Sequence, residues 1–346
     1  MLAALWTEAG CQSRRVDPTV LRVGYLSNVT HLVALSAAGR HSYERALAPA
    51  RVEWRAFSAG PEEMEALFAG AIDVGYVGPG PAQIAYLRSR GEALVVLAGA
   101  ASGGAALLVR GEASGKKAAI TRIEDLHGAA LATPQLGNTQ DVALRTFLFD
   151  HGLKTLERGG DVRVMPLANS SVPGLFLRGD LDGAWVPEPW VSILRQGYGA
   201  RVLVDERTLW PEGRFPTTVV VAARPAIEHK RDLVVRFVAA HAAEVAWVRA
   251  HPEETQKIVG ERIRQITGKA LPEAVLVSAL AAIEPTLDPL RAALMTQAAH
   301  ARRLGYLPAG SLDGLIDGSL LDAAMKAGQS VPAPRAASAA DGAPSP

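Results

Sequence analysis

The chain has 346 residues, of which 49% are hydrophobic and 21% are charged, a composition typical of a globular protein with a core large enough for two domains. Its 36 basic and 35 acidic side chains nearly cancel. This balance excludes the strong field of one sign by which proteins attract nucleic acid.

The N-terminal segment holds the only cysteine of the chain, Cys11. A single cysteine cannot form an internal disulfide or a cysteine metal cluster. Small residues before Cys11 and polar residues after it resemble the end of a lipoprotein signal, but a basic start and a long apolar run are missing and Glu8 is unusual at its position. We interpret residues 1–19 as a signal remnant and linker, with Cys11 as the lipidated residue. A disordered end with an incidental cysteine is the alternative.

One unit of sequence occurs twice. GAIDVGYV at residues 70–77 and GDLDGAWV at residues 179–186 share one pattern, and their aspartates, Asp73 and Asp182, are 182 − 73 = 109 positions apart. Thr30 and Thr139, each after a short apolar strand pattern, are separated by 139 − 30 = 109 positions as well. Two landmarks at one offset indicate a duplicated structural unit.

In chain order, each copy predicts strand, helix, strand, helix, strand. Period-two and β-branched patterns predict strands at residues 23–26, 52–57, 93–99, 105–109, 130–133, 162–167 and 217–223, and the repeated segments 70–77 and 179–186 supply the third strand of each copy. Helical spacing predicts helices at residues 61–69 and 141–150, and mainly helix from Pro225 to about residue 326 with a break at His251 and Pro252. Three histidines look like exposed helix positions: His229, His241 and His251.

This alternation predicts an α/β fold of two lobes, each a doubly wound, mainly parallel sheet with flanking helices. We expect lobe one to comprise residues 20–105 and 216–326, and lobe two to comprise residues 106–215, with the chain crossing between them twice. The Ala-, Pro- and Ser-rich residues 327–346 are expected to form a disordered tail. No apolar run reaches the roughly 20 residues that cross a bilayer.

Ligands of parallel α/β sheets bind beyond the carboxyl ends of the strands, and two lobes with facing strand ends form a cleft. Loops that follow predicted strands therefore supply the candidate ligand-binding residues. They are Asn28, Thr30, His31, Gly78, Pro79, Gly80, Pro81, Ser102, Gly103, Gly137, Asn138, Thr139, Gln140, Glu188 and Trp190.

The loop at residues 137–141 carries the clearest chemistry. Unpaired N–H groups at a helix N-terminus attract anions, and Asn138, Thr139 and Gln140 add side-chain donors. Ordinary N-capping also selects Asn and Thr. Asn28 and Thr30 repeat the arrangement in the other lobe, which favours a role in ligand contact.

Other candidates have two interpretations each. His31 donates to an anion or packs at the rim, and Ser102 with Gly103 contacts ligand or permits the crossover between lobes. Glu188 either meets a cationic group of a zwitterionic ligand or accepts backbone N–H groups and shapes its loop. Trp190 offers its face to an apolar part of the ligand, whereas Tyr76 and Trp185 are expected to pack beneath the loops.

Signatures of catalysis are missing from the sequence. It contains no Gly-x-Ser-x-Gly elbow, no His-Glu-x-x-His motif and no phosphate-binding loop. Its eight histidines show no metal-ligand spacing. We therefore predict no enzyme, no catalytic residue, no metal and no cofactor.

Three motifs resemble the nitrate/sulfonate/taurine family of solute-binding proteins of ABC importers, over about residues 20–325. They are LGNTQD at residues 136–141, GPGPA at residues 78–82 and DGAWVPEPW at residues 182–190. The resemblance implies a type II periplasmic-binding fold with two hinge crossovers and an extracytoplasmic receptor, without catalysis, that delivers a small solute to a membrane permease. We expect the receptor to be a monomer.

Proteins of this family bind nitrate, bicarbonate, sulfonates, taurine or thiamine-pyrimidine precursors, so the resemblance leaves the ligand open. Glu188 favours an organic, zwitterionic sulfonate over a bare inorganic anion. Hinge closure on the ligand is the implied mechanism. An enzyme that uses His31 and Glu188 as acid and base is the alternative from another class, and a sensory domain is a third.

Overall fold

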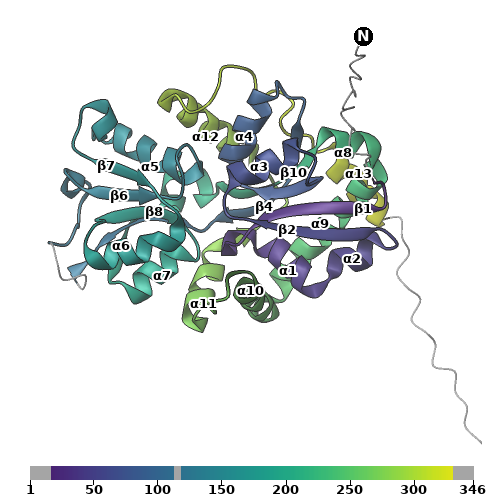
Figure 1. Cartoon of the computed structure of the whole chain (residues 1–346), viewed down its shortest axis with the longest axis horizontal. Coiled ribbons are helices and arrows are strands. Elements are labelled where there is room, and N and C mark those ends of the chain that lie inside the picture. Colours follow the sequence, from purple (N-terminus) through teal and green to yellow (C-terminus); the bar gives the residue numbers. More distant parts are fainter. Residues whose placement is uncertain (1–16, 113–117, 330–346) are drawn as a thin grey trace, which may run out of the picture.

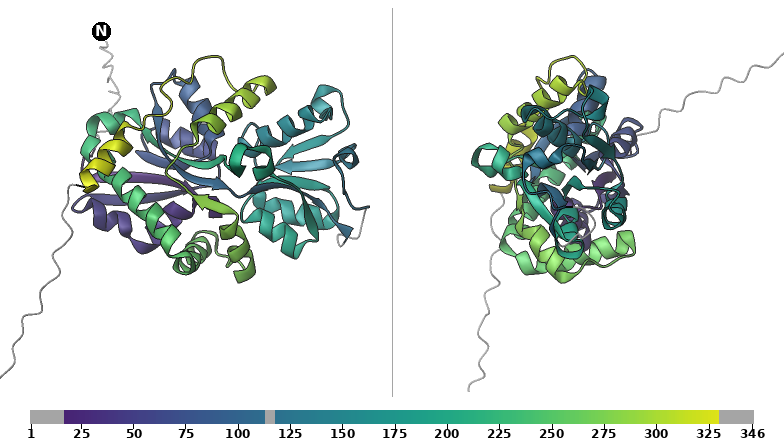
Figure 2. Two further views of the ribbon diagram at one scale, coloured as in Figure 1. Left: turned by 180° about the vertical axis from the view of Figure 1, so that it is seen from behind. Right: turned by 90° about the vertical axis from the view of Figure 1, so that its left-hand side faces the viewer.

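The computed structural model describes residues 17–112 and 118–329, which form two lobes side by side along the longest axis of the molecule (Figures 1 and 2). Cys11 and the end of the expected tail lie outside the described residues. The fold is α/β, as predicted, with one sheet in each lobe. Among the described residues, no helix is long and apolar enough to span a membrane.

The six-stranded sheet of lobe one has the order β11-β4-β10-β3-β1-β2. Strand β1 pairs in parallel with β2 and β3, whereas β10 is antiparallel to β3 and β4. The strands are β1 (Val20–Leu26), β2 (Arg51–Phe57), β3 (Val74–Val77), β4 (Leu94–Gly103), β10 (Pro216–Ala223) and β11 (Ile283–Pro285). Helices cover both faces of this sheet (Figure 1).

The five-stranded sheet of lobe two has the order β7-β6-β8-β5-β9. Strand β6 pairs in parallel with β7 and β8, and β5 pairs antiparallel with β8 and β9. The strands are β5 (Ala105–Arg110), β6 (Ala130–Thr133), β7 (Arg163–Pro166), β8 (Gly183–Pro187) and β9 (Ala200–Asp205). The order β7-β6-β8 repeats the order β2-β1-β3, as the duplicated sequence predicts.

The helices follow the predicted alternation. In lobe two they are α5 (Thr139–Asp150), α6 (Val172–Arg178) and α7 (Trp190–Gly197). In lobe one they are α1 (Leu32–Arg40), α2 (Ser42–Leu47), α3 (Gly60–Phe68), α4 (Pro79–Arg88), α8 (Arg224–His229), α9 (Arg231–Ala250), α10 (Pro252–Thr267), α11 (Glu273–Ala281), α12 (Arg291–Leu304) and α13 (Ser319–Gln329). Helix α9 ends and α10 begins at the predicted break.

The repeated aspartates tie neighbouring strands together in the same way in both lobes. The N–H of Asp73 donates to the Arg22 carbonyl at 2.8 Å, and its carboxylate accepts from the Arg22 N–H at 2.8 Å. Asp182 makes the equivalent pair with Ala130, at 2.7 and 2.9 Å. Both aspartates therefore lock the start of the third strand to the first strand, which explains their recurrence.

Two segments connect the lobes. Strand β4 passes directly into β5 through Gly103 and Gly104, whose φ angles of 80° and 74° suit glycine. The chain returns from β9 to β10 through two short turns, η6 (Glu206–Leu209) and η7 (Pro211–Gly213). These segments are the two predicted hinge crossovers.

The predicted exposure of His241 is wrong, and strand β11 was not predicted. His241 is fully buried, not exposed: its Nε2–H donates to the Gly99 carbonyl at 2.8 Å, and its Nδ1 lies 2.9 Å from the Tyr76 hydroxyl. Helix α9 is covered on more than one side, so its polar positions do not all face solvent. Strand β11 interrupts the expected helical region and extends the sheet beside β4.

Candidate functional site

A cleft of about 690 Å³ lies between the lobes, at the carboxyl ends of the parallel strands. Lobe one contributes the ends of β1, β2 and β3, and lobe two contributes the ends of β6, β7 and β8. The equivalent loops of the two copies thus face one another, as expected of a duplicated unit whose strand ends meet.

Nine of the fifteen predicted residues line this cleft. They are Asn28, Thr30, His31, Gly78, Pro81, Asn138, Thr139, Gln140 and Trp190. The structure therefore brings together the two loops that the sequence analysis paired across the lobes, those at residues 28–31 and 138–140.

The other six predicted residues do not line the cleft. Pro79, Gly80, Gly137 and Glu188 belong to the same loops but are not among the residues that line the cleft. Ser102 and Gly103 lie at the hinge instead, beside a shallow surface pocket that also contains Arg207 and Arg214. The Ser102 hydroxyl accepts from the Phe215 N–H at 3.2 Å. Strand β4 continues past the cleft to cross between the lobes, so its end holds the crossover.

A buried aspartate fixes the loop before α5. The Asp141 carboxylate accepts from the Thr133 hydroxyl at 2.8 Å, the Gly137 N–H at 2.9 Å and the Arg145 guanidinium at 3.1 Å. Gly137 adopts a φ of 72°, which favours glycine. Asn138 caps α5, because its Oδ1 accepts from the Asp141 N–H at 2.9 Å. Capping leaves the Asn138 amide NH₂ to donate to another group.

His31 is a neutral donor. Its Nδ1 accepts from the Leu26 N–H at 3.2 Å, so the ring proton resides on Nε2. Burial lowers the pKa of His31 to about 3, which keeps the ring uncharged at neutral pH. The backbone of the same turn is anchored by the Thr218 hydroxyl, which donates to the Thr30 carbonyl at 3.0 Å.

Glu188 is buried beneath its loop. One carboxylate oxygen accepts from the Ser192 N–H and the other from the Ser192 hydroxyl, both at 3.0 Å. Burial raises the pKa of Glu188 to about 7, against the effect of these hydrogen bonds. Of the two interpretations of Glu188, this geometry supports loop shaping. It also separates Glu188 from His31, so the two do not form an acid–base pair that faces the cleft.

The lobes touch at two places beside the cleft. The Trp190 Nε1–H donates to Asn28 Oδ1, and the Gly80 N–H donates to the Thr139 hydroxyl, each at 3.4 Å. The two contacts join equivalent loops of the repeat but not identical positions, since 28 + 109 = 137 and 80 + 109 = 189 fall close to Thr139 and Trp190. In each, the loop after the first strand of one copy meets the loop after the third strand of the other.

Sequence reasoning missed the loops after the middle strands β2 and β7. These add Phe57, Ser58 and Gly60 from lobe one, and Asn169 and Ser170 from lobe two. Gln135, Thr217, Ile266 and Thr267 also line the cleft. The strand-end rule could have found the middle loops, but the end of α10 enters the cleft only through tertiary packing.

All residues that line the cleft are uncharged at neutral pH. Helices α3 and α5 and the turn before α1 begin there, so unpaired N–H groups converge on it from both lobes. Within the described residues, no group of three His, Cys, Asp or Glu side chains is placed to hold a metal ion. The cleft therefore offers hydrogen-bond donors and positive dipole ends to a ligand.

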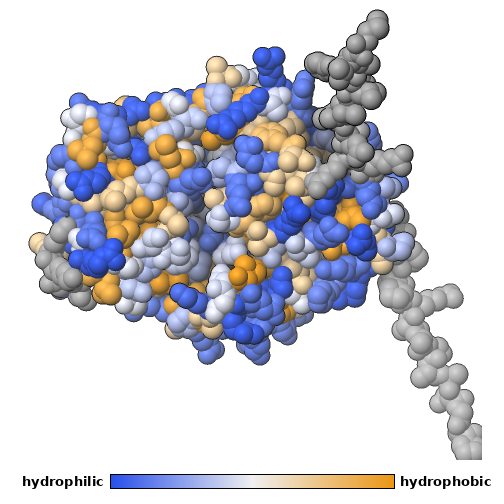
Figure 3. Space-filling view, in the orientation of Figure 1, coloured by the Kyte–Doolittle hydropathy of each residue, from blue (hydrophilic) through white to orange (hydrophobic). Residues whose placement is uncertain are grey.

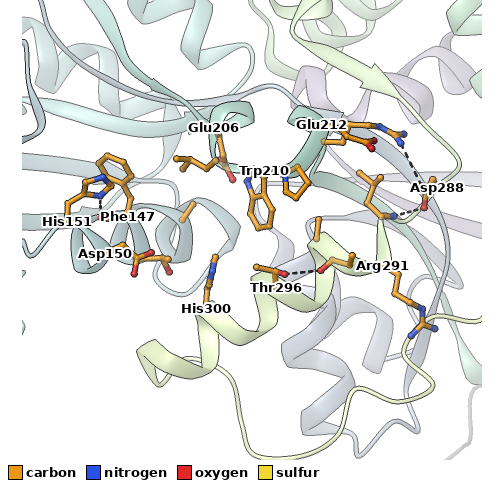
Figure 4. A pocket seen from close by; sticks show the side chains of 18 residues that line it. Phe147, Asp150, His151, Glu206, Trp210, Glu212, Asp288, Arg291, Thr296 and His300 are labelled. Carbon is orange, nitrogen blue, oxygen red and sulfur yellow. Dashed lines mark hydrogen bonds and ion pairs between the residues drawn. The ribbon is translucent and has the colours of Figure 1, made fainter.

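A second cavity, of about 680 Å³, lies between α5, the return crossover and α12 (Figure 4). At its wall the Trp185 Nε1–H donates to the Glu206 carboxylate at 2.7 Å, and Trp210 lies between Glu206 and His300. Burial raises the pKa of Glu206 to about 7, and the Trp185 hydrogen bond opposes this rise. The polar strand-end loops do not reach this cavity, so we assign it to the packing around the return crossover and not to the ligand site.

Comparison with known proteins gives a consistent picture. The model of the NMT1-like family matches residues 14–263. The taurine-binding periplasmic protein of Escherichia coli (strain K12) is 29% identical over 195 residues, which are 56% of this chain and 56% of that protein. The putative aliphatic sulfonates-binding protein of the same strain is 26% identical over 270 residues, or 78% of each chain.

Among solved structures, the periplasmic aliphatic sulphonate binding protein SsuA from Escherichia coli superposes with a TM-score of 0.67 at 25% sequence identity. The superposition covers 84% of this chain and 92% of that one. The likeness therefore extends over both lobes.

Proposed function

Because this chain belongs to the NMT1-like family, we propose that it is the extracytoplasmic solute receptor of an ABC importer and that it closes on a small organic oxyanion of the sulfonate class. The proposal also includes delivery of the solute to a membrane permease, a monomeric state and attachment to the membrane through Cys11. It includes no catalytic step.

One observation carries the proposal: an uncharged cleft into which helices from both lobes direct their N-termini. The partial positive charge at each terminus favours an anion, and side-chain donors such as His31 Nε2–H and the Asn138 amide supply further hydrogen bonds. Neutral donors bind a compact oxyanion without the desolvation cost of burying an arginine or lysine.

The size of the cleft favours an organic ligand. Its volume of about 690 Å³ falls within the usual range for small-molecule sites, roughly 300–1,000 Å³. A bare inorganic anion would fill only a small part of it. Phe57, Trp190 and Ile266 line the cleft as well and offer apolar surface to the rest of an organic molecule.

Closure provides the signal to the permease. A ligand held by both lobes stabilises the closed arrangement because its contacts with the second lobe form only there. The two crossovers absorb the rotation, and Gly103 with Gly104 gives one of them conformational freedom. A differential affinity of about 5.5 kcal/mol converts a 1:99 mixture of closed and open states into 99:1.

Titration calorimetry with a panel of alkanesulfonates, taurine and nitrate tests the proposal. The double variant Asn138→Ala with Thr139→Ala should bind the best ligand at least about tenfold more weakly, since each lost hydrogen bond to an anion contributes about 1.5–3 kcal/mol. Thr296→Ala, in the second cavity, is the matched control and should bind normally. Unchanged affinity of the double variant would remove this loop from the site, and loss of binding in the control would move the site to the second cavity.

A further inference from the structure

The second cavity is almost as large as the cleft, at about 680 Å³ against about 690 Å³. Three parts of the chain form its walls: the C-terminal part of α5 in lobe two, the return crossover, and α12 with the segment before it in lobe one (Figure 4). A volume of this size suits a small molecule. The packing around the return crossover therefore leaves room for an occupant, away from the strand-end loops of the cleft.

Glu206 is a wall residue with an unmet hydrogen-bonding need. It is only 1% exposed. One carboxylate oxygen accepts from the Trp185 Nε1–H at 2.7 Å, whereas Oε1 has no hydrogen-bond partner among the described residues. A buried carboxylate oxygen without a donor is costly, so a molecule that donates to Oε1 would be stabilised here.

Two other buried polar atoms of the wall lack partners within the described part of the chain. They are Trp210 Nε1, on the return crossover, and the Thr146 hydroxyl, on α5. Figure 4 shows Trp210 beside the Glu206 carboxylate, and it is close enough to help lower the pKa of Glu206, but no hydrogen bond joins the two side chains. Unsatisfied polar atoms from α5 and from the crossover thus converge on one cavity.

The charged side chains of the wall have an excess of acid. Four carboxylates and two guanidinium groups line the cavity, those of Asp150, Glu206, Glu212, Asp288, Arg214 and Arg291. Arg214 is held by the Glu284 carboxylate at 3.0 Å, and Asp150 is paired with Arg303 at 2.8 Å. Burial lowers the pKa of His300, which disfavours its cationic form. Charge complementarity therefore favours a cation as the occupant.

From this geometry we infer that the second cavity is a binding site for a small organic cation, whose ammonium group is held by the Glu206 carboxylate. Phe147, Leu209 and Trp210 offer apolar and aromatic surface to the body of such a molecule. An ammonium supplies several hydrogen-bond donors, whereas the described side chains include no group of three His, Cys, Asp or Glu that could hold a metal ion. The site is separate from the cleft and does not depend on the proposed sulfonate ligand.

Benzylamine and benzyl alcohol form a matched pair of probes, since they carry an ammonium and a hydroxyl on the same body at pH 8. At this pH the Glu206 carboxylate is ionised, because its pKa is about 7. Calorimetry on the full chain should show benzylamine binding at least about tenfold more tightly than benzyl alcohol. No binding of benzylamine, or equal binding of the two probes, would overturn the inference.

Glu206→Gln keeps the shape of the side chain and an acceptor for Trp185 but removes the charge. Benzylamine should bind this variant at least about tenfold more weakly, while the affinity for benzyl alcohol should not change. Glu63→Gln is the matched control, because Glu63 is likewise a fully buried carboxylate but does not line the cavity. Unchanged benzylamine affinity in Glu206→Gln, or equal weakening in both variants, would contradict the inference.

A second pair of variants tests the place of binding without changing a charge. Ala293→Phe fills the cavity from α12 and should weaken benzylamine binding at least about tenfold. Ala299→Phe adds the same ring at an exposed position of the same helix, outside the cavity, and should bind benzylamine normally. Normal binding by folded Ala293→Phe would place the amine elsewhere on the protein and overturn the inference.

Discussion

Glu188→Gln should remove a pH-dependent loss of stability from lobe two. Glutamine has nearly the same shape and keeps an acceptor for the Ser192 N–H, but it cannot ionise. In the native protein Glu188 is only 2% exposed, and burial raises its pKa from the ordinary value of 4.5 to about 7. The folded state therefore retains a proton that the unfolded chain has already released.

The sign and size of the effect follow from this difference. Because the pKa is raised on folding, the contribution of Glu188 to stability is fully present below pH 4.5 and is lost as the pH rises through about 7. The interval between 4.5 and about 7, at about 1.4 kcal/mol per pH unit, corresponds to about 3 kcal/mol. The native protein should lose this amount relative to Glu188→Gln between pH 4 and pH 8.

Urea unfolding of both proteins at several pH values, followed by tryptophan fluorescence, measures the effect. The informative quantity is the difference in unfolding free energy between variant and native protein at each pH. Other groups with raised pKa values, such as Glu206, contribute equally to both proteins and cancel. A difference that stays constant from pH 4 to pH 8 would refute the reasoning and place Glu188 in contact with water in solution.

Two further changes probe the lobe contact and the core. Gly80→Ala would put a methyl group 3.2 Å from the Thr139 backbone nitrogen, which belongs to the opposite lobe. The closed state would be strained, so ligand affinity measured by calorimetry should fall about tenfold. The control Gly197→Ala has open space around the added methyl group and should bind ligand normally. Glu63 is fully buried, and burial raises its pKa well above the ordinary value. Glu63→Gln should therefore stabilise lobe one against urea at pH 8 but not at pH 4. Equal effects at both pH values would show that ionisation of Glu63 does not affect stability in this range.

The fold was largely predictable from the sequence because it is encoded twice. Each copy repeats strand, helix, strand, helix, strand, and a chance match in one copy would not recur at the same offset in the other. The Asp73 and Asp182 contacts give the recurrence a physical basis, since both carboxylates accept from the backbone of the first strand of their unit. A residue that holds two strands in register is subject to the same structural constraint in both copies of the unit.

Side-chain direction was much harder to predict. The sequence places Glu188 in a loop beside the cleft, but only packing decides that its carboxylate turns inward to Ser192. Similarly, Ser102 and Gly103 lie at the end of a buried strand, the position from which the ligand loops of other strands begin. They belong instead to the segment that crosses between the lobes. The buried position of His241 depends on strand β4 and Tyr76, which lie far away in the sequence.

The two interlobe hydrogen bonds beside the cleft connect the repeat to closure. Thr139 and Asn28 both lie in loops that begin helices at the cleft, and each also accepts a hydrogen bond from the opposite lobe, from Gly80 and Trp190. A ligand bound by these loops would therefore influence the geometry of both contacts. Because both contacts join strand-end loops of opposite lobes beside one cleft, a rotation that opens the cleft should separate both of them. Under the proposed function, binding and closure would be coupled through the same four loops, which are also the loops where the sequence motifs cluster.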